Sequence, residues 1–78
     1  MRETSLKFIV SFESTHTAIA MDKAAAAAGL PGKLIPVPRQ ITASCGLAWM
    51  APAEDRAAVE SFIAESGLEY GGFWEIEF

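Results

Sequence analysis

The chain has 78 residues, of which 51% are hydrophobic and 21% charged, and its formal net charge is -4. This length fits one domain over residues 1–78, and the apolar composition is typical of a folded chain rather than a disordered one. The acidic charge and the scattered basic residues argue against nucleic acid or an anionic membrane surface as the main partner.

A strand and a helix are predicted at the start of the chain. Residues 6–12 alternate between two faces with the period-two pattern of a strand that has one better-buried side. Ser14 or Thr15 then suits the N-cap of a helix, and Gly29 is expected to end that helix. One face of the helix should point inward, and it carries Ala18, Met21, Ala25 and Ala28.

Two further strands are predicted next, with a polar loop between them. Residues 33–38 suit a strand at a sheet edge, because Pro36 and Pro38 cannot donate hydrogen bonds to a ladder. Residues 39–45 are expected to form the loop, and residues 46–51 the next apolar strand.

A second helix and a last strand complete the prediction. Pro52 suits the first turn of the helix, and Gly67 is expected to end it. Its inner stripe would consist of Val59, Phe62, Ile63 and Ser66. Residues 70–78 alternate again, and the Gly71-Gly72 pair indicates a bend or bulge at the entry to this strand. One side of the strand would carry Trp74, Ile76 and Phe78, and the other Glu75 and Glu77.

The element order β-α-β-β-α-β indicates the ferredoxin-like α+β fold, with two helices on one face of a four-stranded antiparallel sheet. In this topology three segments meet at one end of the sheet, namely residues 12–17, 37–39 and 44–46. The only cysteine, Cys45, lies in the last of them. We therefore expect Cys45 close to the amino-terminal end of the first helix.

A thiol in that position is expected to be reactive, because a helix N-terminus or a nearby cation lowers the pKa of cysteine and favours the nucleophilic thiolate. Arg39 and His16 could reach the same end of the sheet, as a permanent charge and a titratable group. Gly46 would leave the backbone beside the sulfur open. The remaining polar candidates around a bound anion are Ser14, Thr15 and Ser44.

Each of these residues also has a purely structural interpretation. Cys45 could be a small buried hydrophobe, although its polar loop favours exposure. His16 and Arg39 could be ordinary solvated side chains, and Ser14 and Thr15 need no role beyond capping. A lone cysteine forms no internal disulfide, and no zinc-type spacing of Cys and His occurs, so neither a metal nor another cofactor is expected.

The N-terminal residues lack the apolar run of a signal peptide, and no stretch approaches the ~18 apolar residues of a membrane span. We therefore expect a cytoplasmic location without a membrane partner. In that reducing compartment a lone thiol stays free.

Three blocks of the sequence carry a family resemblance: residues 12–18, residues 34–41 and residues 44–48. In order and spacing they resemble the small bacterial domains described as Putative Se/S carrier protein-like. The resemblance implies a carrier that holds sulfur or selenium on Cys45 as a persulfide or selenopersulfide. A cysteine desulfurase or selenocysteine lyase would be the donor, and an acceptor enzyme would take the atom.

The resemblance also implies that the chain is a substrate of other enzymes and not an enzyme itself. It assigns chalcogen attachment to Cys45 and supporting roles to Ser14, Thr15, His16 and Arg39. The alternative is a non-catalytic interaction or regulatory module that docks another protein, or a second copy, on its open sheet face. That face would bear Ile9, Trp49 and Phe73. An RNA-recognition role is disfavoured by the acidic charge and the absence of an aromatic-basic motif.

Overall fold

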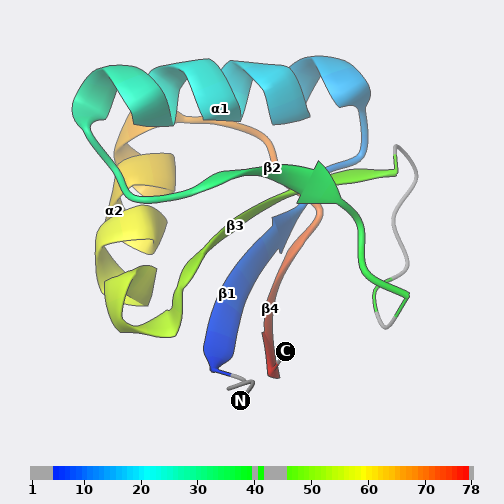
Figure 1. Ribbon diagram of the computed structural model, residues 1–78. Helices are drawn as coiled ribbons and strands as arrows, with labels where there is room; N and C mark the ends of the chain where they lie inside the picture. Colours follow the sequence, from blue (N-terminus) through cyan, green and yellow to red (C-terminus); the bar gives the residue numbers. More distant parts are fainter. Residues whose placement is uncertain (1–4, 40, 42–45, 78) are drawn as a thin grey trace.

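The computed structural model describes residues 5–39, 41 and 46–77. Its strands are β1 (Leu6–Ser11), β2 (Lys33–Pro36), β3 (Leu47–Pro52) and β4 (Gly72–Glu77), and its helices are α1 (Thr15–Ala28), the short 3-10 helix η1 (Ala53–Asp55) and α2 (Arg56–Ser66). Apart from η1 the elements follow the predicted order β-α-β-β-α-β (Figure 1).

The four strands form one antiparallel sheet in the order β2-β3-β1-β4. This arrangement confirms the ferredoxin-like α+β fold and the edge position predicted for β2. The start of β1 and the end of β4 lie together at the bottom of Figure 1, where Leu6 pairs with Glu77.

All four strands differ from their predicted bounds by one or two residues, and two of these differences concern prolines. β2 stops at Pro36 and not at Pro38, although the amide of Val37 still donates a hydrogen bond to the carbonyl oxygen of Gly46. Pro52 is the last residue of β3 and not the first turn of a helix. The second α-helix begins only at Arg56, because the 3-10 helix η1 lies between the end of β3 and α2 and turns the chain there.

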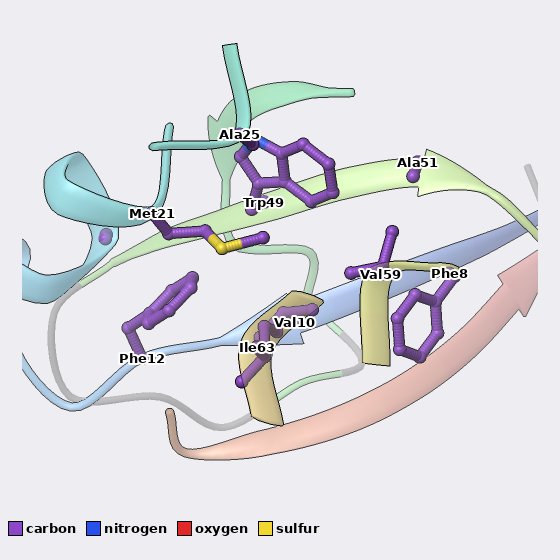
Figure 2. Close-up of a cluster of buried hydrophobic side chains, with 10 residues drawn as sticks. Phe8, Val10, Phe12, Met21, Ala25, Trp49, Ala51, Val59 and Ile63 are labelled. Atoms are coloured by element: carbon purple, nitrogen blue, oxygen red, sulfur yellow. The ribbon is translucent and has the colours of Figure 1, made fainter. Parts of the chain in front are cut away.

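The larger part of the core lies between the sheet and the two helices (Figure 2). Alternate strand residues point into it, as the period-two pattern requires. Met21 and Ala25 enter it from α1, and Val59 and Ile63 enter it from α2. The strand and linker residues of this layer are Phe8, Val10, Phe12, Trp49 and Ala51.

The opposite face of the sheet is also partly covered. Ile9 and Ala48 are fully buried there, and Ile41 packs against them from the segment that follows β2. The assignment of Ile9, Trp49 and Phe73 to an open sheet face is therefore wrong. Trp49 and Phe73 lie on the helix side of the sheet, and Ile9 lies beneath Ile41.

Both helices end where glycine was expected to end them. Gly29 and Gly67 have φ of 78° and 70°, the left-handed conformation that favours glycine at a C-cap. Ala28 and Ser66, the last residues of α1 and α2, are exposed although they were predicted to face inward, because the chain already leaves the helix at the next residue. Phe62 is half-buried against the core.

The Gly71-Gly72 pair enters the last strand through the predicted bend. The amide of Gly71 donates a hydrogen bond of 2.6 Å to the carbonyl oxygen of Ser11. A Cβ at Gly71 would lie 3.1 Å from the Ser11 Oγ, so the two segments approach closely. Among the described residues, no helix has both the length and the apolar character needed to cross a membrane.

Candidate functional site

One end of the sheet collects the segments that the topology predicted to converge. Ser11 at the end of β1 pairs with Ala48 of β3 and with Gly72 of β4, and Pro36 at the end of β2 pairs with Leu47. α1 begins just beyond the same end of β1 (Figure 1). The described parts of the three predicted segments therefore share this sheet end.

Of the two predicted N-cap candidates for α1, Ser14 is the cap and Thr15 is the first residue of the helix. The backbone of Ser14 is extended, and its Oγ accepts a hydrogen bond of 3.3 Å from the amide of Thr17. The Thr17 hydroxyl in turn donates to the Ser14 carbonyl oxygen at 3.0 Å. The cap satisfies one of the amides that the first helical turn leaves unpaired, and it fixes the direction in which the helix N-terminus points.

A backbone hydrogen bond closes the segment between β2 and β3, in which Cys45 stands in the sequence. The amide of Val37 donates a hydrogen bond of 3.0 Å to the carbonyl oxygen of Gly46, which joins the two ends of the loop. Gly46 has φ of 78°, and nothing lies within 4 Å of a Cβ built on it. Glycine is thus needed here for backbone conformation and not for lack of space.

Ile41 fixes the same loop to the sheet, a role that sequence reasoning did not find. Its side chain is 5% exposed and packs on Ile9 and Ala48. Its amide donates a hydrogen bond of 3.0 Å to the carbonyl oxygen of Pro38, which closes a tight turn. The only signal in the sequence was one large apolar residue within a polar loop.

Besides Ser14 and Gly46, the predicted site residues fall into two groups. Ser44 and Cys45 lie outside the described residues. Thr15, His16 and Arg39 are exposed, and the side chains of His16 and Arg39 make no hydrogen bond or ion pair with another residue in the described ranges. The structure places His16 in the first turn of α1 and Arg39 in the loop after β2, both toward this end of the sheet.

A hollow of about 430 Å³ opens beside the N-terminus of α1. Its walls are formed by Glu13, Ser14, Thr17, Leu68, Glu69 and Tyr70. Two carboxylates in the wall oppose the binding of a free anion in this hollow. Within the described ranges, no group of three or more His, Cys, Asp or Glu side chains could hold a metal ion.

The fold and this sheet end define a small ferredoxin-like α+β protein whose predicted functional loop joins two strands. A family model described as Putative Se/S carrier protein-like matches residues 7–75, and the chain therefore belongs to that family. The family description supports a general role in carrying selenium or sulfur. No curated protein and no solved structure gave a significant match.

The N-cap provides a first test of the local structure. Ser14→Ala removes the oxygen that accepts from Thr17, and we expect it to lower the free energy of unfolding by about 1 kcal/mol. Ser14→Asp keeps an acceptor at the positive end of the helix and should stay close to the wild-type stability. Urea denaturation followed by circular dichroism measures both variants. Equal stability of all three proteins would show that the cap does not hold the helix end.

Proposed function

We propose that the protein carries selenium or sulfur covalently on Cys45, as a selenopersulfide or persulfide, and delivers it to an acceptor enzyme. The observation that carries this proposal is the family match, which extends over residues 7–75 and so includes the only cysteine of the chain. A persulfide forms only on a thiol. A carrier of this kind therefore has one attachment point in this sequence.

Loading follows the logic of thiol-disulfide exchange. The Cys45 thiolate attacks the terminal sulfur of a persulfide on the donor enzyme. A bond forms between the Cys45 Sγ and that sulfur, and the donor cysteine leaves as a thiolate. In delivery, a thiolate of the acceptor attacks the terminal sulfur, and Cys45 leaves as a thiolate. Neither step needs an added oxidant or reductant.

Two features of this sheet end support an anionic cargo, and they act against the carboxylates of Glu13 and Glu69 in the hollow beside α1. The capped N-terminus of α1 carries a partial positive charge at this end of the sheet. Arg39 is permanently charged and exposed, so it can meet an anionic persulfide or selenopersulfide. His16 is exposed in the first turn of α1, where it can exchange a proton with solvent or a partner.

In this proposal the protein is a stoichiometric substrate and not an enzyme. Its donor is of the cysteine desulfurase or selenocysteine lyase type, and both exchange reactions require close approach of a second protein to Cys45. The loop predicted for Cys45 between two strands suits that approach, because loops tolerate a binding partner without disturbance of the core.

Intact mass spectrometry tests the proposal directly. The protein is incubated with a cysteine desulfurase and cysteine, and separately with a selenocysteine lyase and selenocysteine. We expect the mass to increase by one sulfur or one selenium atom, and the increase to disappear on treatment with a reductant. Cys45→Ser should show no increase at all. An increase that persists in Cys45→Ser, or none in the wild-type protein, would refute the assignment.

A further inference from the structure

The two edges of the sheet differ in how well they are protected. β2 has four residues and ends at Pro36, and short strands with proline are poor templates for another strand. β4 has six residues, Gly72–Glu77, and contains neither proline nor lysine. Within the described part of the chain its only neighbour in the sheet is β1. The outer backbone groups of β4 therefore lack a strand partner among these residues.

β4 is also regular along its whole length. Its pairing with β1 runs without a bulge from Glu77 opposite Leu6 to Gly72 opposite Ser11. The indole nitrogen of Trp74 donates a hydrogen bond of 3.1 Å to the Ser11 Oγ, which fixes the large side chain on the strand. A regular, fixed strand with an unpaired outer edge is the template required for strand addition.

The side chains of β4 give the two faces of this edge different chemistry. Trp74, opposite Ile9, and Ile76 lie on the sheet face away from the helices, and Trp74 is 37% exposed. Glu75 and Glu77 lie on the helix side, opposite Phe8 and Leu6. A strand added here would thus meet apolar side chains on one face and carboxylates on the other.

A hollow of about 440 Å³ lies between α2 and the start of β4, on the acidic face of this edge. Its walls are formed by Glu60, Ile63, Ala64, Gly67, Leu68, Tyr70 and Phe73. The rings of Tyr70 and Phe73 stack at a centroid distance of 4.3 Å and form one side of it. The hollow can receive the aliphatic part of a lysine or arginine side chain of an added strand.

The charges on this face favour a basic occupant. Arg56 forms ion pairs of 2.5 Å with Glu60 and with Glu75, and these two pairs raise the pKa of Arg56. Glu77 is exposed and forms no ion pair with another described residue. Among the described residues, this face thus carries three carboxylates, of which Arg56 pairs with two. A second copy paired antiparallel along β4 would bring its own Glu75 and Glu77 onto this face, which opposes self-association.

We infer that the outer edge of β4 binds an extended, basic segment of another protein, which adds to the sheet as a further strand. Lysine or arginine side chains of this segment face Glu75 and Glu77, and its alternate apolar side chains lie beside Trp74 and Ile76. This interaction surface does not depend on the carrier function of Cys45.

Labelled peptides test the inference by fluorescence anisotropy. The probe is an eight-residue peptide in which lysine alternates with valine. We expect it to bind about tenfold more tightly than the same peptide with glutamate for lysine, since two favourable cross-strand charge pairs are replaced by unfavourable ones. A lysine peptide with proline at two interior positions should bind as weakly as the glutamate peptide. Equal binding of all three would overturn the proposal.

Two protein variants and one structural measurement locate the site. Glu77→Lys should weaken binding of the lysine peptide about fivefold, because one charge pair becomes repulsive. Glu65→Lys makes the same charge change at an exposed position of α2 that does not line the hollow, and it should leave binding unchanged. Hydrogen exchange should slow at the amides of residues 72–77 when the peptide is bound. Equal effects of both variants, protection elsewhere, or a dimer that excludes the peptide would each refute the inference.

Discussion

Gly32→Ala is expected to lower the free energy of unfolding by about 3 kcal/mol, the upper part of the usual range for overpacking. A Cβ at this position would lie 2.3 Å from both Cζ2 and Cη2 of the Trp49 ring. It would also lie 2.6 Å from the carbonyl oxygen of Met50. Trp49 is fully buried in the core and Met50 belongs to the β3 ladder, so neither group can move away without loss of packing or pairing.

Urea denaturation followed by tryptophan fluorescence measures this loss. The double variant Gly32→Ala with Trp49→Phe should lose less stability than the sum of the two single changes, because the smaller ring relieves part of the clash. Trp49→Phe also removes an indole N–H that is buried without a hydrogen-bond partner among the described residues. A Gly32→Ala protein within about 0.5 kcal/mol of the wild type would show that residue 32 does not pack against this ring.

Elements with a local signal could be predicted from the sequence. The C-caps at Gly29 and Gly67 follow from backbone chemistry at single positions, and both are confirmed. For the N-cap of α1 the sequence narrows the choice to Ser14 or Thr15, and Ser14 is the one observed. The edge position of β2 likewise follows from Pro36. The element order β-α-β-β-α-β is compatible with only a few sheet topologies, because connections are short and right-handed. The ferredoxin-like arrangement is the one observed.

Features that depend on contacts distant in the sequence could not be predicted in the same way. The alternation in residues 6–12 indicated two faces, but it did not reveal that Ile41 covers the second face at Ile9. The sequence does not place Trp49 and Phe73 on the correct face, because no local signal states which side of a strand the helices cover. The contact between Gly32 and Trp49 likewise depends on how the α1–β2 connection crosses β3.

For the candidate site, the topology gave the convergence of segments at one sheet end, and the described residues confirm it. Cys45 and Ser44 lie outside those residues, so the proximity of Cys45 to Arg39 and His16 remains a prediction. The structure adds two features that support the loop, namely the hydrogen bond from Val37 to Gly46 and the packing of Ile41. Both depend on tertiary contacts that a pattern of residue types does not encode.

Ile41→Ala is expected to slow the loading of Cys45 by a donor enzyme without a change in the intrinsic reactivity of the Cys45 thiol. The change removes most of a side chain that is 5% exposed, so we expect a loss of about 2 kcal/mol in the free energy of unfolding. It also removes the contact that holds the loop to Ile9 and Ala48. Loading of Cys45 by a desulfurase should therefore slow about tenfold, because a transfer reaction depends on the orientation of the reacting groups.

Alkylation by iodoacetamide gives the contrasting measurement, because this small reagent needs no protein partner and no fixed loop geometry. Its rate with Ile41→Ala should stay close to that of the wild type. Ile35→Ala is the matched control, since Ile35 packs on the same buried cluster from β2 but lies outside the loop. This control should lose stability and still load at the wild-type rate. If both variants load equally slowly, stability alone limits transfer; if both load normally, Ile41 does not position the cysteine.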